Sequence, residues 1–243
     1  MTERLMSANY VVIGEMYQSF TMRDQLLSSL DQLKQGKWLQ VLAIDALKTN
    51  EDSGTSNYLK QMDSMPSSLA YHYRPFVLWA NQNDVVLLGA STPKEKLNGL
   101  RKPEGQQWIE QQTLGVLTRH NQQTLQNILN EAHPVDKQDQ NKNRYLLAAH
   151  KLNDYFMARL ITSTTQNTLL LTRAFHARKD LGVEPYIQKL KPGSKITTVL
   201  MLGSEYNQEL PSDQINSMKQ YYDYVWLQKP EQTPLLAPKG QDK

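Results

Sequence analysis

Short apolar runs alternate with longer amphipathic stretches along this chain. The runs lie at 10–13, 39–44, 85–88, 168–172, 197–202 and 224–227. Because they are apolar on both alternations, they are typical of strands that are covered on both faces of a parallel sheet. The spacer at 21–35 has an apolar stripe of helical period, which Gly36 can end. The pattern predicts an α/β fold in which a mostly parallel sheet is flanked by helices.

The pattern changes between residues 103 and 163, where no strand-like run occurs. Two long helical stretches, roughly 105–132 and 137–162, are separated by His133-Pro134, because proline and the residue before it disfavour a continuous helix. We therefore predict a helical hairpin subdomain at 103–163. It would interrupt a discontinuous α/β domain formed by 1–102 and 164–230, and 231–243 would be a loose tail.

Composition narrows the classes of function. A formal net charge of +3 is too small to predict nucleic-acid binding, although a few converging cations would suit an anionic small molecule. The absence of cysteine excludes disulfides, thiolate catalysis and cysteine-ligated metal centres. No apolar run approaches the roughly 18 residues that a membrane-spanning helix needs. The first residues contain no secretion signal.

Two loops that follow predicted strands contain candidate ligand-binding residues, because ligands of parallel sheets usually bind at the carboxyl ends of strands. The first loop offers Glu15 and Tyr17. The loop after 168–172 offers four basic or titratable side chains: Arg173, His176, Arg178 and Lys179. Such side chains suit carboxylate or phosphate recognition. Purely structural roles stay open for these residues. His176 could be a surface histidine, and Tyr17 could pack at the edge of the core with its hydroxyl in water. Lys179 and Asp180 could be a solvent-exposed ion pair.

Sequence motifs of common hydrolases are missing. The chain has no His-Glu-x-x-His, no Gly-x-Ser-x-Gly and no glycine-rich phosphate loop. The other histidines are poorly placed for a metal hydrolase: His72, His120, His133 and His150. Ser91 or Thr92 ahead of Pro93 is better explained as a helix cap than as a catalytic residue.

Several short motifs occur in an order that resembles a known family. They are Gly14-Glu15-Met16-Tyr17, Asp45 at the end of the second strand, Tyr73-Arg74-Pro75, Ser91-Thr92-Pro93, Asp154-Tyr155-Phe156-Met157-Ala158, the loop at 174–183 and Asp223-Tyr224-Val225-Trp226. From about Asn9 to Trp226 the sequence resembles the ChaN-like haem-binding family, iron-regulated lipoproteins distantly related to erythromycin esterase and Tiki-type proteins.

The resemblance implies a haem-binding protein (haem b) without enzyme activity that acts in haem or iron acquisition. It further implies an axial tyrosine on the haem iron, for which Tyr17 is the candidate and Tyr71 and Tyr73 are alternatives. His176 would contact the haem propionates, with Arg178 or Lys179 beside it. Haem would be bound between the two copies of a homodimer. The implied location is the periplasm or the outer membrane, through a lipid anchor ahead of this sequence, with an outer-membrane haem receptor or other envelope partner.

The sequence departs from the family pattern at two informative positions. Tyr17 stands where related hydrolases have a histidine, and Arg173 stands where they have a glycine. These changes favour binding over hydrolysis. Two other functions stay open: a metal-dependent esterase or protease that uses Glu15, Asp45 and His176, and an interaction module whose glutamine-rich helical segment docks a partner.

Overall fold

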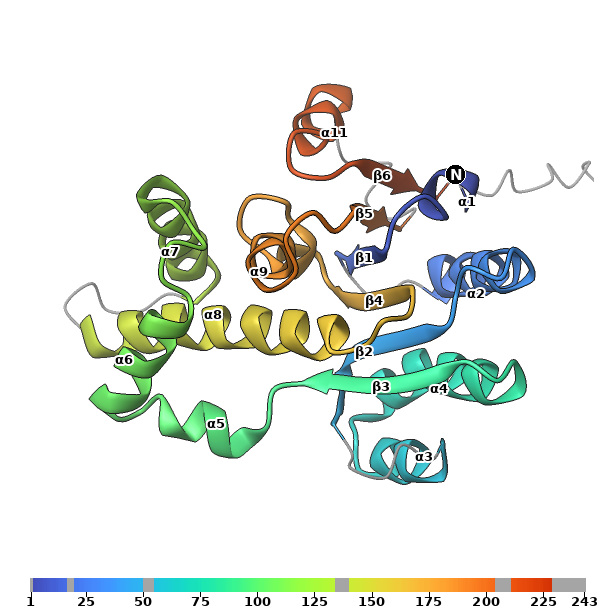
Figure 1. The fold of residues 1–243 in the computed structure, drawn as a ribbon, viewed down its shortest axis with the longest axis horizontal. Helices are drawn as coiled ribbons and strands as arrows, with labels where there is room; N and C mark the ends of the chain where they lie inside the picture. Colours follow the sequence, from blue (N-terminus) through green and yellow to red (C-terminus); the bar gives the residue numbers. More distant parts are fainter. Residues whose placement is uncertain (1, 17–19, 50–54, 134–139, 204–210, 229–243) are drawn as a thin grey trace, which may run out of the picture.

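The computed structural model describes residues 2–16, 20–49, 55–133, 140–203 and 211–228. These residues form six strands: β1 (Tyr10–Glu15), β2 (Val41–Lys48), β3 (Val86–Ser91), β4 (Thr168–Arg173), β5 (Ile196–Leu202) and β6 (Tyr224–Leu227). They build one sheet in the order β3-β2-β4-β1-β5-β6 (Figure 1), and every pairing among them is parallel. The predicted α/β class is confirmed.

One face of the sheet is covered by α2 (Phe20–Gln35) and α4 (Ser67–Gln82), with α1 (Thr2–Leu5) and α3 (Thr55–Asp63) nearby. Alternate strand residues such as Val11, Leu42 and Leu171 point into this layer and are fully buried. The apolar stripe predicted at 21–35 therefore lies against the sheet, and its helix ends ahead of Gly36 as expected.

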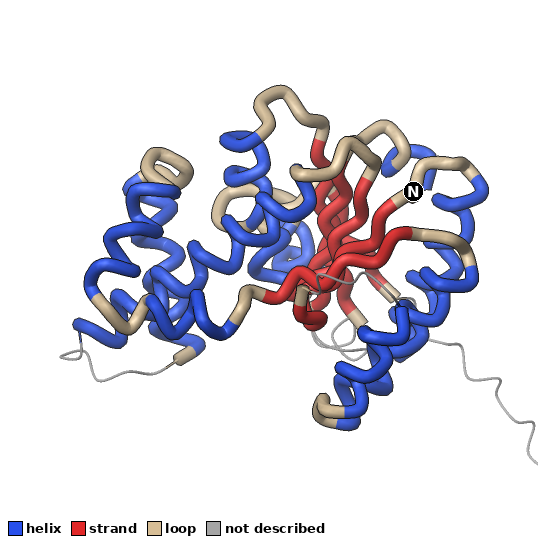
Figure 2. The backbone as a smooth tube through the Cα atoms, turned by 60° about the horizontal axis from the view of Figure 1, so that its bottom comes forward, coloured by secondary structure: helices blue, strands red, loops and turns tan. Residues whose placement is uncertain are grey.

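The other face is covered by α8 (Gln140–Thr162) and α9 (Val183–Leu190), so that the sheet lies between two helical layers (Figure 2). The intervening strand residues, among them Val12, Ala43 and Leu170, pack against this second layer. Burial on both faces explains why the strands contain consecutive apolar residues and do not alternate between apolar and polar positions.

The segment between β3 and β4 is helical, and it contains α5 (Lys94–Gly99), α6 (Pro103–Gln112) and α7 (Arg119–Ala132) before α8. The prediction of one continuous helix over 105–132 is wrong, because the helix is interrupted between α6 and α7. Gly115 adopts a positive φ of 75° there, and the Thr118 hydroxyl accepts a hydrogen bond from the Asn121 amide that caps α7. That 103–163 forms a separate subdomain stays a prediction.

The connections of the sheet place several loops at one edge. The chain passes from β1 outward to β2 and β3, returns to β4 beside β1, and then continues to β5 on the other side. The carboxyl ends of β1, β2 and β4 consequently lie together at a point where the strand order reverses, which is the usual ligand site of such sheets. No helix of the described residues is both long and apolar enough to cross a membrane.

The last described elements are α11 (Ser212–Met218) and β6, which is the edge strand beside β5. The tail predicted at 231–243 lies outside the described residues.

Candidate functional site

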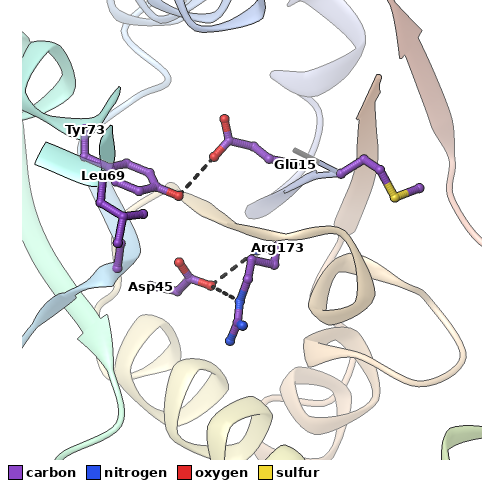
Figure 3. A pocket seen from close by; sticks show the side chains of 7 residues that line it. Glu15, Asp45, Leu69, Tyr73 and Arg173 are labelled. Atoms are coloured by element: carbon purple, nitrogen blue, oxygen red, sulfur yellow. Dashed lines mark hydrogen bonds and ion pairs between the residues drawn. The ribbon is translucent and has the colours of Figure 1, made fainter. Parts of the chain in front are cut away.

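A cavity of about 470 Å³ lies at the carboxyl ends of β1, β2 and β4 (Figure 3). Its lining is formed by Glu15, Met16, Asp45, Ala46, Leu69, Tyr73 and Arg173. Apolar side chains thus share the cavity with two carboxyl groups, a phenol and a guanidinium group. This composition suits a ligand that has a large apolar body and a few polar or anionic groups.

Glu15 ends β1 with its side chain 5% exposed, and two residues of α4 hold its carboxyl group. Nε2 of His72 lies 2.8 Å from Oε1, and the Tyr73 hydroxyl donates to Oε2 at 3.2 Å. Figure 3 shows the Tyr73 ring and the Glu15 carboxyl group facing each other. His72 is fully buried, so the three side chains form a polar network that connects β1 to α4.

Asp45 lies in the second half of β2. Its Oδ2 accepts hydrogen bonds from the Thr172 hydroxyl at 2.6 Å and from the backbone N–H of Arg173 at 3.3 Å. The Arg173 side chain is 73% exposed, and its Nε lies 3.9 Å from the same oxygen. Asp45 therefore fixes the end of β4 and holds the base of the Arg173 side chain beside the cavity (Figure 3).

Two smaller cavities adjoin the first one, with volumes of about 160 Å³ and 200 Å³. Arg173 lines all three cavities, and His176 lines both of the smaller ones. The 200 Å³ cavity is bounded mainly by apolar side chains of α7 and α8 and by Phe175. Arg173 is consequently the cation that a ligand at this edge of the sheet would meet.

His176 lies on the short 3-10 helix η1 (Ala174–Ala177), directly after β4. Its side chain is buried, and its Nδ1 lies 2.6 Å from Oδ1 of Asp154 on α8. Its Nε2 lies 3.5 Å from Nη2 of Arg173. The aspartate orients the ring so that Nε2 is the atom on the side of the exposed guanidinium.

His150, one helical turn before Asp154, completes a buried cluster. Its ring stacks on that of His176 with 4.5 Å between centroids, and its Nε2 lies 3.1 Å from Oδ2 of Asp154. Burial lowers the pKa of His150, which favours a neutral imidazole. Burial alone would raise the pKa of Asp154, but the two imidazoles outweigh it, and this pKa lies below its usual value.

Arg178 and Lys179, also predicted site residues, have carboxylate partners within the fold. Arg178 donates to Asp180 at 2.9 Å and 2.7 Å and lies 3.8 Å from the centre of the Tyr221 ring. Lys179 donates to Asp223 at 3.2 Å. Their role towards a ligand stays a prediction, and the geometry favours Arg173 and His176 over them.

Glu184, beside this loop, makes the stability of the fold depend on pH. Burial, with Asp223 close by, raises the pKa of Glu184 from 4.5 to about 7, although Lys179 acts in the opposite direction. The folded state therefore binds more protons than the unfolded state between about pH 4.5 and 7. The free energy of unfolding of the protein should therefore fall as the pH rises through this window.

We expect Glu184→Gln to flatten that part of the stability profile, measured as the urea midpoint at several pH values. Glu131→Gln, at an exposed position on α7, is the control that should keep the slope. An unchanged slope in Glu184→Gln would contradict the assignment.

The three tyrosines proposed as metal ligands have different environments. Tyr17 follows Met16 directly in the chain but lies outside the described residues. Tyr71 is 61% exposed and stacks near Arg23, at 5.2 Å from ring centre to guanidinium. Tyr73 is buried, and burial followed by the charges of Glu15 and Asp45 raises the pKa of its hydroxyl far above the usual value. A phenolate at Tyr73 is therefore strongly disfavoured.

The three residues of the hydrolase hypothesis do not form one group that could share a metal ion, although Glu15 and Asp45 line one cavity, and Asp45 and His176 line another. Among the described residues, the group of histidine and carboxylate side chains close enough to share a metal ion is His150, Asp154 and His176. Glu15 and Asp45 are instead held by the partners described above.

Two features of the site escaped the sequence reasoning. His150 and Asp154 are spaced i, i+4 on α8, a spacing that places both on one helical face and could have been recognised. His72 meets Glu15 across 57 residues, and no local pattern predicts such a contact.

The comparisons with known proteins agree with this architecture. Residues 1–187 match the family model described as "Haem-binding uptake, Tiki superfamily, ChaN". The chain belongs to this family. No curated protein matches it.

Among solved structures, the chain is similar to ChaN of Campylobacter jejuni, described as binding haem cofacially, with a TM-score of 0.67 and 16% identity over 93% of this chain and 89% of that one. A Bacillus cereus protein has a TM-score of 0.49 and 12% identity, over 83% of this chain and 67% of that one. A succinoglycan biosynthesis protein has a TM-score of 0.45 and 11% identity, over 83% and 68%. The ChaN family membership rests on the first 187 residues, and the ChaN-like fold extends over nearly the whole chain.

Proposed function

We propose that this protein binds haem at the carboxyl edge of its sheet. The observation that supports this best is the 470 Å³ cavity at the strand ends of a ChaN family member. Met16, Ala46 and Leu69 offer apolar surface for a porphyrin ring, and Arg173 offers a cation for a carboxylate. The chemistry of the lining therefore fits a ligand that combines an apolar ring with two propionates.

Tyr17 is the iron ligand that we propose. A bound ferric haem would supply an iron that accepts a phenolate. Tyr17 follows Met16, which lines the cavity. Tyr73 lines the same cavity, but its buried hydroxyl donates to Glu15 and keeps its proton. Tyr71 is exposed on α4 and lines a different hollow together with Met62 and Arg74.

Arg173 and His176 are the residues that we propose for the propionates. Arg173 is exposed and lines all three cavities described above, and its Nε lies 3.9 Å from Oδ2 of Asp45. His176 has its Nδ1 held by Asp154, so Nε2 faces the same side as Arg173, and it would donate to a propionate only with a proton on both ring nitrogens. Arg173 ends β4 and His176 follows three residues later, and both side chains line the two smaller cavities beside the first one.

Removal of the Arg173 charge tests this assignment. A hydrogen bond to a charged group contributes about 1.5–3 kcal/mol, so Arg173→Ala should weaken hemin binding by roughly tenfold or more in an absorption titration. The control is Arg101→Ala, which removes an exposed arginine distant from Arg173 in the sequence and should bind hemin as wild type does. Equal affinity of Arg173→Ala and wild type would contradict the propionate role.

We also propose the assembly and setting that the family suggests. The Campylobacter jejuni relative is described as binding haem cofacially. In this protein two copies would bring their haem-b-carrying edges face to face, and light scattering should show a dimer in the presence of hemin. The proposed setting is haem acquisition at the cell envelope, in the periplasm or on a lipid anchor at the outer membrane, with a haem receptor or other envelope partner.

We propose binding without catalysis, because Glu15, Asp45 and His176 are each held by other partners and do not form one group that could share a metal ion. The docking of a partner by the glutamine-rich helices also stays a prediction, and a deletion of 103–163 that kept partner binding would argue against it.

A further inference from the structure

His150, Asp154 and His176 form a buried cluster beneath the loop that follows β4. Asp154 is fully buried, and the two histidines are 8% and 5% exposed. The ligand atoms of the three side chains all lie within 4.8 Å of one another. We propose that these three residues bind a divalent transition-metal ion of the zinc class. None of the three residues lines the 470 Å³ cavity; the site shares His176 with the proposed propionate contacts but does not depend on haem binding.

Two atoms in the cluster lack the partners that buried polar atoms normally have. Nε2 of His150 and Oδ2 of Asp154 are both buried, and neither has a hydrogen-bond partner. They face each other at 3.1 Å without the geometry of a hydrogen bond. A buried polar atom without a partner destabilises the fold. A cation between them would satisfy both lone pairs at once.

The spacing of these atoms suits a metal ion. Two ligand atoms that each lie about 2.0–2.1 Å from a tetrahedral zinc ion are roughly 3.3 Å apart. The 3.1 Å between His150 and Asp154 needs little adjustment. The 2.6 Å between Nδ1 of His176 and Oδ1 is a hydrogen-bond distance, so the ion would replace the proton there. Two imidazoles and one carboxylate form a ligand set typical of such ions.

Charge also favours a cation at this place. Asp154 contacts the two imidazoles, and its charge also acts on the buried hydroxyl of Tyr186. The guanidinium of Arg173 approaches Nε2 of His176, on the other side of that ring, and is itself largely exposed. A buried carboxylate between two imidazoles is a place where a cation would be stabilised.

The surroundings leave room for a fourth ligand and a path for the ion. His150 and His176 both line the 200 Å³ cavity, and His176 also lines the 160 Å³ cavity. A water molecule could therefore reach the ion from either side. An ion on Nδ1 of His176 would leave Nε2–H pointing outward as a donor, the arrangement usual for metal-bound histidines. Metal binding and anion recognition by His176 are thus compatible.

Calorimetric titration of the metal-free and haem-free protein with Zn²⁺ tests the proposal. We expect one ion per chain, release of protons on binding, and a rise in the thermal midpoint. A cobalt titration should give visible absorption bands of a tetrahedral or five-coordinate ion with nitrogen ligands. Absence of one-to-one binding at micromolar concentrations would overturn the proposal.

Variants locate the ion. His150→Phe keeps a flat ring against His176 but removes a ligand atom, and Asp154→Asn removes the charge. Each should weaken Zn²⁺ binding at least tenfold, with folding checked by circular dichroism. If Asp154→Asn does not fold, His150→Phe alone decides. His120→Ala, at an exposed histidine on α7, should bind as wild type does. Unchanged binding by His150→Phe, or loss in His120→Ala, would place the ion elsewhere and contradict the proposal.

Discussion

Replacement of Glu15 by alanine is expected to lower the free energy of unfolding by about 2–5 kcal/mol. The substitution removes the acceptor that both His72 and Tyr73 contact, so two polar groups on α4 lose their shared partner inside the fold. Each such loss costs about 1–3 kcal/mol. Urea denaturation followed by circular dichroism measures the effect.

Two further substitutions of glutamate give this experiment its controls. Glu15→Gln keeps the size of the side chain and one acceptor oxygen, so it should cost less than alanine. Glu131→Ala removes a carboxyl group from an exposed site and should change stability by less than about 0.5 kcal/mol. A Glu15→Ala protein as stable as wild type would mean that this network does not join β1 to α4.

Replacement of Gly182 by alanine is expected to disturb the loop that presents His176. A Cβ atom at Gly182 would lie only 2.1 Å from the carbonyl oxygen of His176 and 2.9 Å from that of Arg178. Both contacts are with backbone atoms, which cannot rotate away as a side chain can. We expect a loss of about 3 kcal/mol in the free energy of unfolding, at the upper end for overpacking.

Because the displaced atoms belong to His176 itself, Gly182→Ala should also weaken hemin binding. The matched control is Gly99→Ala at the end of α5, where a Cβ atom meets nothing within 4 Å. Its stability should change by no more than about 1 kcal/mol, the difference in helix propensity between the two residues. Equal stability of the two variants would show that the loop backbone can shift without an energetic cost, and it would contradict this expectation.

The sheet could be predicted from the sequence because its strands are buried on both sides. The run at 168–172 has three consecutive leucines between two buried threonines, a pattern typical of a strand covered on both faces. The break between α6 and α7 was missed because the apolar periodicity continues across it. Only the backbone conformation at Gly115 and the cap at Thr118 end one helix and begin the next.

The candidate site was predicted as far as it depends on strand ends. Glu15, Asp45 and Arg173 meet at one cavity because parallel strands bring their carboxyl ends to the same edge. The partners that decide what these side chains can do come from distant helices, such as His72 for Glu15 and Asp154 for His176. Such contacts depend on how helices pack on the sheet, which a single sequence does not reveal.

Charge partners explain why the basic loop divides into two parts. The sequence presents Arg173, Arg178 and Lys179 as equivalent cations. In the fold, Arg178 and Lys179 are held by Asp180 and Asp223, and Arg173 remains exposed beside the cavity. The side chain with the least internal pairing is the one that a ligand can best use.

An absorption titration of the purified wild-type protein with hemin, repeated with Tyr17→Phe, tests the proposed haem binding most directly. The proposal predicts saturation at one hemin per chain with a tyrosinate-type spectrum, and loss of that spectrum in Tyr17→Phe but not in Tyr71→Phe. A titration in which the spectrum of free hemin persists without saturation would contradict it.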